Sequence, residues 1–246
     1  MPAPVDILAF SPHPDDAEIG CGGLLLLSAR QGLKTGIVDL SEGERSTRGT
    51  PAIRLKEKAV AAERLHVAER IGLGLPDTEI GTAPAHEAAL VACLRELRPR
   101  LVLAPYHQDR HPDHVEASRL IDRAAFFAGV REVGSGAPHR IERLLHYCVH
   151  QPVAPSLVFD VTDVWPDYRN GLAAYQSQFF GADDAASTAL SGGGFLEALE
   201  ARGRHCGAMV NARYGEPYMS PAPLRVDSPL SLLRPAGTKA SYGSYR

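Results

Sequence analysis

The chain has 246 residues, of which 44% are hydrophobic and 22% are charged, the composition of an ordinary globular protein. This composition excludes an intrinsically disordered chain, which needs low hydrophobicity and high charge. The 26 Lys and Arg stand against 29 Asp and Glu, and no basic run occurs, so nucleic acid is not expected as a partner. At this length we expect a single domain over residues 1–246.

The chain contains 4 cysteines, which are far apart in sequence and include no C-x-x-C pair. Neither a disulfide framework nor a thiolate zinc site is therefore expected. The first ten residues lack a basic segment, and no stretch is apolar enough to form a signal peptide or a membrane span. These observations predict a cytoplasmic protein with reduced thiols and no membrane partner.

In the first half of the chain, short apolar strands alternate with helices. The predicted elements, in chain order, are a strand at 5–10, a helix at 17–31, a strand at 34–40, a helix from Pro51 to about His66, a strand near 69–74, a helix at 84–97, a strand at 101–104 and a helix at 112–128. This alternation predicts a Rossmann-like, doubly wound α/β fold. Its mostly parallel sheet should have helices on both faces and the strand order 3-2-1-4.

The second half of the chain is less regular. It contains predicted strands at 144–149 and 157–161 and predicted helices near 163–178 and 194–208. We expect a mobile loop at 181–194, which could close over a substrate, and an extended tail from Pro217. The domain would then comprise a core over about 1–130 and a C-terminal elaboration over about 140–246.

Two segments rich in His and Asp follow predicted strands. Ser11-Pro-His13-Pro-Asp15-Asp16-Ala-Glu18 follows the first strand, and His107-Gln-Asp109-Arg110-His111-Pro-Asp113-His114 follows the fourth. Carboxylates at a helix start repel a phosphate but suit a cation. Because strands one and four are neighbours in the predicted sheet, both segments should meet outside their carboxyl ends. Two imidazoles and one carboxylate are a common catalytic zinc set.

The segment Ser11–Gly23 together with His111-Pro-Asp-His114 resembles the two signature motifs of the LmbE-like (PIG-L) zinc-dependent N-acetylglucosamine deacetylases. Further similarity, closest to the branch that deacetylates N-acetylglucosaminyl malate in bacillithiol biosynthesis, lies at Asp39–Glu44, Gly49-Thr50, Arg54-x-x-Glu57, Asp109-Arg110 and Tyr175-x-Ser-Gln178. The resemblance implies an LmbE-like deacetylase domain, one zinc per chain and a homo-oligomer such as a hexamer. The same ligand set also accepts Fe²⁺ or another divalent ion.

The resemblance also implies roles for individual residues. His13, Asp16 and His114 match the zinc ligands, and Asp15 matches the general base. His111 matches the residue that supports the oxyanion, and Asp113 matches the carboxylate that orients or charges that imidazole. These roles agree with the chemistry of amide hydrolysis, because zinc lowers the pKa of a bound water and a nearby carboxylate can take its proton.

Four further residues are candidates for substrate contacts. Arg54 and Arg110 match positions near the substrate and could bind the carboxylates of a malate group bidentately. Glu44 and Ser46 lie in the loop after the second strand, on the same rim, and could contact sugar hydroxyls. A solvated surface position is an alternative for Arg54, and a solvated loop is an alternative for Glu44 and Ser46.

Other functions remain as alternatives. The protein could deacetylate another N-acetylglucosamine conjugate, or it could be a metal-dependent phosphoesterase, although such enzymes often hold two metals. It could also be a non-enzymatic protein that binds a sugar or a metal. His146, Cys148 and His150 alternate on one predicted strand face, but no carboxylate is adjacent in sequence, so we expect core or rim positions there.

Overall fold

The computed structural model describes residues 2–180, 187–191, 194–225 and 228. Within these ranges, seven strands form one sheet in the order β3-β2-β1-β4-β5-β7-β6. The strands are β1 (Ile7–Ser11), β2 (Thr35–Asp39), β3 (Glu69–Gly72), β4 (Leu101–Pro105), β5 (Arg143–Tyr147), β6 (Leu157–Asp160) and β7 (Gly215–Met219). Neighbours from β3 to β5 are parallel, whereas β7 runs antiparallel to β5 and β6. The predicted mostly parallel, doubly wound sheet is confirmed.

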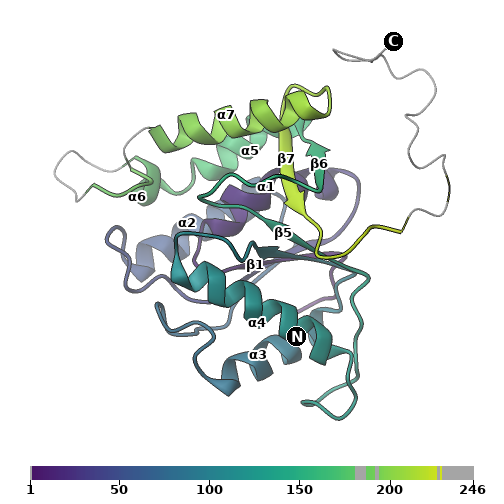
Figure 1. Ribbon diagram of the computed structural model, residues 1–246. Coiled ribbons are helices and arrows are strands. Elements are labelled where there is room, and N and C mark those ends of the chain that lie inside the picture. Colours follow the sequence, from purple (N-terminus) through teal and green to yellow (C-terminus); the bar gives the residue numbers. More distant parts are fainter. Residues whose placement is uncertain (1, 181–186, 192–193, 226–227, 229–246) are drawn as a thin grey trace.

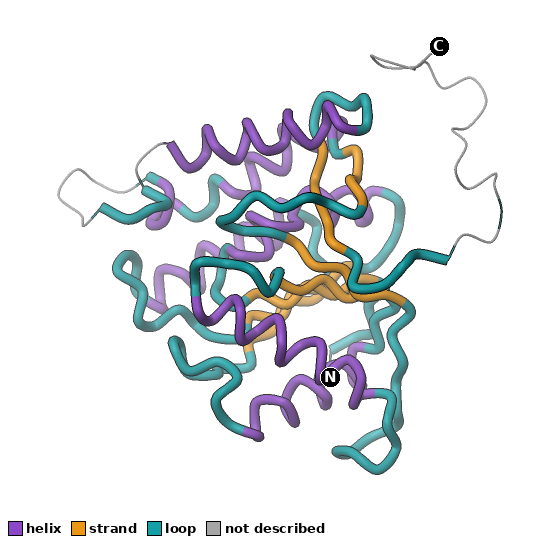
Figure 2. The backbone as a smooth tube through the Cα atoms, viewed as in Figure 1, coloured by secondary structure: helices purple, strands orange, loops and turns teal. Residues whose placement is uncertain are grey.

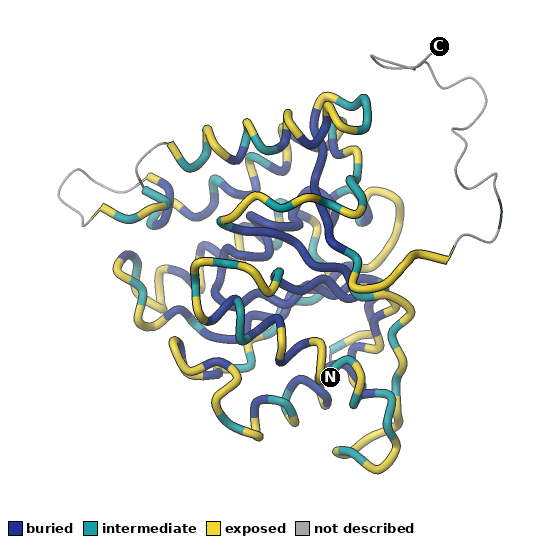
Figure 3. The backbone as a smooth tube through the Cα atoms, viewed as in Figure 1, coloured by how far each residue is buried: buried dark blue, intermediate teal, exposed yellow. Residues whose placement is uncertain are grey.

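Helices cover both faces of this sheet (Figures 1 and 2). Their bounds are α1 (Asp16–Arg30), α2 (Pro51–Arg64), α3 (Pro84–Leu97), α4 (Pro112–Ala128), α5 (Trp165–Leu172), α6 (Gln176–Phe179) and α7 (Gly194–Met209). The helices α3 and α4 pack on one face, and α1, α2 and α5 pack on the other. Figure 3 shows the buried strands between these two layers. Among the described helices, none is both long enough and apolar enough to cross a bilayer.

Glycines in α1 allow two tyrosine rings to approach the helix closely. A Cβ atom on Gly20 would lie 2.0 Å from Cδ2 of Tyr147, and one on Gly22 would lie 2.8 Å from Cε2 of Tyr168. The Tyr147 hydroxyl also donates to the Phe10 carbonyl at 2.6 Å. These contacts hold α1 against the carboxyl end of β1, which fixes both ends of the turn between them.

A buried polar network ties the adjoining elements together. Nε of Arg70 donates to Asp39 at 3.0 Å, and Nη1 of Arg70 donates to Glu18 at 2.5 Å. The Tyr175 hydroxyl donates to the same Glu18 oxygen at 2.7 Å. The network therefore joins β3, β2 and α1 to the segment between α5 and α6, and its charges are paired as burial requires.

The predicted helix at 163–178 is wrong in detail. The structure divides it into a 3₁₀ turn (Thr162–Val164), α5 and α6. The break between α5 and α6 brings Tyr175 inward to the network around Glu18. The reason for this break is a tertiary contact, which outweighs the local helical preference of the segment.

The extended tail expected from Pro217 is in fact partly a strand, because β7 spans Gly215–Met219. Proline normally argues against a strand within a sheet, since it cannot donate to the ladder. Here Pro217 pairs with Val158 of β6, whereas the pairing with β5 begins only at Tyr218. Of the expected loop at 181–194, residues 181–186 and 192–193 lie outside the described part of the chain.

Glu216 of β7 binds the middle of α1 from a distant part of the chain. Its two carboxylate oxygens accept the backbone N–H groups of Gly23, at 3.0 Å, and Leu24, at 2.7 Å. The Tyr218 hydroxyl donates to the same side chain at 2.8 Å. Burial raises the pKa of Glu216 to about 7, although these hydrogen bonds oppose the shift.

Glu216→Gln should therefore remove a pH-dependent part of the stability. Because the pKa is higher in the folded than in the unfolded state, the wild-type side chain contributes most at low pH and progressively less between about pH 4.5 and pH 7. We expect the difference in unfolding free energy between wild type and variant to fall by up to about 3 kcal/mol over this range and to be flat above it. Urea denaturation at several pH values measures this difference, and a difference independent of pH would contradict the assignment.

Candidate active site

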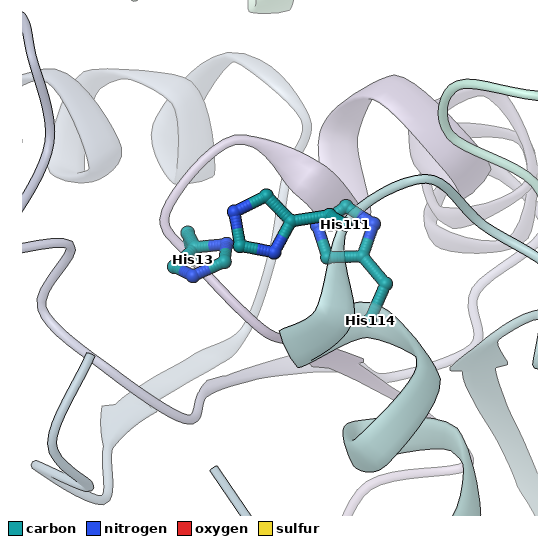
Figure 4. A group of neighbouring side chains, drawn as sticks. All are labelled: His13, His111 and His114. Carbon is teal, nitrogen blue, oxygen red and sulfur yellow. The ribbon is translucent and has the colours of Figure 1, made fainter. Parts of the chain in front are cut away.

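The two segments rich in His and Asp lie together at one edge of the sheet. The strand β1 pairs in parallel with β4, so the turn at 12–15 lies beside the loop that leads into α4. The ring centroids of His13 and His111 are 4.8 Å apart, and those of His111 and His114 are 4.9 Å apart. Figure 4 shows these three imidazoles side by side. The expected meeting of the two segments is observed.

Two buried imidazoles converge on one carboxylate oxygen. Oδ2 of Asp16 lies 3.0 Å from Nδ1 of His13 and 3.1 Å from Nε2 of His114. The ring nitrogens of His114 are buried and make no hydrogen bond to a described residue, although carboxylates lie close by. Close nitrogen and carboxylate oxygen atoms that are not aligned for a hydrogen bond are typical of side chains that bind the same cation. The donor set therefore fits a zinc-class ion.

The outer nitrogen of each imidazole faces further carboxylates. Nε2 of His13 lies 3.1 Å from Asp113 and 3.2 Å from Asp77, and Nδ1 of His114 lies 3.4 Å from Asp109. Metal-binding histidines commonly have such outer partners, which fix the tautomer and the ring orientation. The arrangement leaves Nδ1 of His13 and Nε2 of His114 for a metal.

These carboxylates shift the acidity of the site strongly. Burial lowers the pKa of His114, but the Asp16 and Asp109 carboxylates outweigh it and raise that pKa to about 9. Burial raises the pKa of Asp77, but the hydrogen bond with His13 outweighs it, and the pKa falls to about 2. Burial likewise raises the pKa of Asp109, but the nearby His114 ring and the hydrogen bond with His150 outweigh it and hold that pKa well below its usual range. Such a concentration of negative charge favours a positive charge at its centre.

Asp15 occupies a strained position at the start of α1. Its φ angle of 120° is rare for any residue with a side chain. The carboxylate is buried and lies 3.1 Å from Nη2 of Arg54, yet its Oδ2 accepts no hydrogen bond from a described residue. Burial raises the pKa of Asp15 to about 8, although the Arg54 guanidinium opposes the shift. A carboxyl group with a pKa near neutrality is suited to proton transfer.

Arg54 is buried in α2, so the alternative of a solvated surface position is wrong. Its guanidinium donates to the Pro14 carbonyl and, at 2.5 Å, to the Ser46 hydroxyl, in addition to its approach to Asp15. These contacts engage both terminal nitrogens of Arg54 with the chain. The geometry therefore favours Arg54 as the charged partner of Asp15 and as a brace for the turn before α1.

His111 caps the first turn of α4, and its Nδ1 accepts the backbone N–H of Asp113 at 3.2 Å. A neutral ring with this contact carries its proton on Nε2. Burial and the neighbouring imidazoles of His13 and His114 lower the pKa of His111. The Asp113 carboxylate, expected to charge His111, bonds instead to His13 and accepts the N–H of Thr78 at 2.9 Å. The geometry thus favours a neutral His111 that donates from Nε2.

A pocket of about 290 Å³ opens over these groups. Its wall includes Ser46 and Arg54 and also Arg110, which is exposed and makes no hydrogen bond or ion pair with another described residue. Glu44 is not part of the wall, because its carboxylate accepts the backbone N–H of Asp77 at 2.8 Å. Of the expected loop at 181–194, the described residues Thr188 to Leu190 line the pocket.

Two residues of the site were missed by the sequence analysis. Asp77 follows β3 and lies close to His13. The only indication of this role in the sequence was an acidic residue after a strand whose carboxyl end lies at the same edge of the sheet as those of β1 and β4. His150 follows β5 and was expected only at a core or rim position, because no carboxylate is adjacent to it in sequence, yet Asp109 lies 2.9 Å from its Nδ1. That partner is adjacent in space but distant in sequence.

Comparison with known proteins identifies a family model and curated relatives that are named as deacetylases. The family model for GlcNAc-PI de-N-acetylases (PIG-L) matches residues 8–125. A diacetylchitobiose deacetylase of Thermococcus kodakarensis is 30% identical over 189 residues, which cover 70% of each chain. A 1D-myo-inositol 2-acetamido-2-deoxy-alpha-D-glucopyranoside deacetylase of Streptomyces griseus is 29% identical over 56% of this chain and 54% of its own length.

A solved structure extends the similarity over nearly the whole fold. The conserved protein TT1542 of Thermus thermophilus is 40% identical, and its TM-score is 0.83 over 90% of this chain and 97% of that chain. Together with the matches to the family model and to the Thermococcus enzyme, this likeness covers both segments of the site. The chain therefore belongs to the PIG-L (LmbE-like) family of deacetylases, which are amidohydrolases.

Proposed function

We propose that the protein is a zinc-dependent hydrolase that removes the N-acetyl group from an N-acetylglucosaminyl conjugate. One observation carries this proposal: His13 and His114 share the Asp16 carboxylate, while Oδ2 of the nearby Asp15 accepts no hydrogen bond from a described residue. A set of metal ligands beside a carboxylate that can accept a proton is the arrangement that metal-assisted amide hydrolysis requires. Both curated relatives described above are named as deacetylases of acetylated amino sugars.

The proposed reaction divides its steps among five side chains. A zinc-class ion held by His13, Asp16 and His114 would supply a water of lowered pKa and positive charge near the amide oxygen. Asp15 takes the proton of the attacking water and passes it to the amine nitrogen as the C–N bond breaks. His111 donates its Nε2–H to the oxygen of the tetrahedral intermediate.

The metal count separates this proposal from a phosphoesterase, which often uses two ions. Three further groups of described residues could hold an ion, namely His13, His111 and His114, then Asp109, His114 and His150, and also His13, Asp77 and Asp113. Each of these shares a histidine with the proposed ligand set, so a second ion would compete for that ligand. The arrangement supports one ion per chain.

For the substrate we propose the malate conjugate of the bacillithiol pathway. The observation that supports an anionic aglycone is Arg110, a cation on the pocket wall that has no ion-pair partner among the described residues. Guanidinium groups bind carboxylates through two parallel hydrogen bonds, so Arg110 is suited to a dicarboxylic group. The inositol conjugate and diacetylchitobiose, which lack this charge, are the competing substrates.

Asp15→Asn should retain the metal and lose most of the turnover. The amide cannot accept the proton of the attacking water, and general-base groups contribute about 10²- to 10⁴-fold to such rates. We expect one zinc per chain by elemental analysis in both proteins and a fall in kcat of at least about 100-fold in the variant. Full activity of Asp15→Asn, or two zinc ions in the wild type, would overturn the mechanism.

The strain at position 15 can be measured separately from the chemistry. Asp15→Gly and Asp15→Ala both remove the carboxylate, but only glycine accepts a φ angle of 120° without cost. We expect Asp15→Gly to be more stable than Asp15→Ala by about 1–2 kcal/mol in urea denaturation of the zinc-free proteins. Equal stabilities would show that the turn relaxes when the carboxylate is removed.

Comparison of substrates tests the role of Arg110. We expect the highest kcat/KM with N-acetylglucosaminyl malate, and we expect Arg110→Gln to lower that value about tenfold because a charge-assisted hydrogen bond is lost. The values for diacetylchitobiose and the inositol conjugate should change little. Arg119→Gln, which alters an exposed arginine of the same segment paired with Glu116, is the matched control. An equal loss with all three substrates would contradict recognition of the malate carboxylates.

A further inference from the structure

We propose that His150 is a positioning residue of the metal site, which holds Asp109 against the outer nitrogen of His114. The inference rests on the proposed role of His114 as a metal ligand. It assigns a function to the loop after β5, so that the end of β5 contributes to the site beside those of β1, β3 and β4.

The Asp109 carboxylate is held by the loop residues on either side of it. Its Oδ1 lies 2.9 Å from Nδ1 of His150 and also accepts the backbone N–H of His111 at 2.9 Å. Its Oδ2 accepts the backbone N–H of His150 at 3.3 Å. His150 thus provides two of the three contacts, one from its ring and one from its backbone, and its ring fixes the oxygen that faces His114.

The same oxygen of Asp109 lies 3.4 Å from Nδ1 of His114. The rings of His114 and His150 also stack, with centroids 5.1 Å apart and planes inclined by 21°. A carboxylate behind a metal-binding imidazole fixes the ring orientation and strengthens the ligand, and its loss typically weakens metal binding about 10- to 100-fold. His150 therefore acts on the metal through Asp109, without contacting it.

The backbone before His150 is itself anchored by the C-terminal part of the chain. Nη1 of Arg202, in α7, donates to the carbonyls of Cys148 at 3.0 Å and Val149 at 2.9 Å. Nη2 of the same guanidinium donates to the Ile19 carbonyl of α1 at 2.9 Å. A single arginine thus fixes the loop that carries His150 relative to the helix that carries Asp16.

A second histidine of the same strand provides a matched control. Nε2 of His146 lies 3.0 Å from the Asp122 carboxylate, and this pair forms no part of the pocket wall. His146 is buried in β5 and forms a His–Asp pair of similar length, but among the described residues Asp122 makes no hydrogen bond or ion pair with the proposed metal ligands. Its replacement alters this His–Asp pair without altering Asp109.

The experiment measures zinc affinity of the full chain by competition with a chromogenic chelator. His150→Phe keeps a ring that can stack on His114 but removes the nitrogen, and we expect its zinc dissociation constant to rise about 10- to 100-fold. His150→Asn places an amide donor near the position of Nδ1 and should restore most of the affinity. His146→Asn should bind zinc as the wild type does. If His150→Phe fails to fold, His150→Ala makes the same comparison with His150→Asn.

Three results would overturn the proposal. These are wild-type zinc affinity in folded His150→Phe, an affinity of His150→Asn as weak as that of His150→Phe, and a second zinc ion that disappears in His150→Phe. The last result would make His150 a ligand at the group formed with Asp109 and His114. A wild type that binds one zinc but deacetylates no amino sugar would instead overturn the proposed function alone, because the comparison of affinities does not depend on turnover.

Discussion

The site depends on the balance of charge around two buried imidazoles. Four carboxylates, those of Asp16, Asp77, Asp109 and Asp113, lie within 3.4 Å of the ring nitrogens of His13 and His114. Buried carboxylates are costly unless positive charge compensates them, so the group requires either protonated imidazoles or a bound cation. The raised pKa of each imidazole expresses the same requirement. A divalent ion meets it while leaving the imidazoles neutral, as ligation demands.

The scaffold holds this charge in a turn that is itself under strain. Asp15 keeps an unfavourable backbone conformation because its neighbours fix both ends of the turn. On one side, Arg54 bonds the Pro14 carbonyl; on the other, Tyr147 fits against Gly20 in α1. Replacement of Gly20 by any larger residue would displace that ring, so the glycines of the first motif serve packing, and the acidic residues before them serve chemistry.

The sequence predicted the centre of the site better than its surroundings. The adjacency of β1 and β4 follows from the alternation of strands and helices, so the meeting of His13 with His114 was predictable. Asp77 and His150 follow β3 and β5, and the paths of those loops carry no periodic signal. The pairing of the Asp113 carboxylate with His13 depends on side-chain orientation, which spacing does not determine. The strand β7 was missed because Pro217 argues against a strand, and only its incomplete pairing with β5 makes it tolerable.

The tie between Glu216 and α1 has a consequence for the order of assembly during synthesis. Gly23 and Glu216 are 193 residues apart, and Arg202 likewise reaches back to the Ile19 carbonyl. A nascent chain that has emerged only as far as α4 contains both motifs, yet it lacks these restraints on α1 and on the β5 loop. Contacts of such long range form late because loop closure must precede them. The proposed ligands therefore emerge from the ribosome well before the residues that restrain them, so the proposed metal site has all its restraints only after β7 has been synthesised.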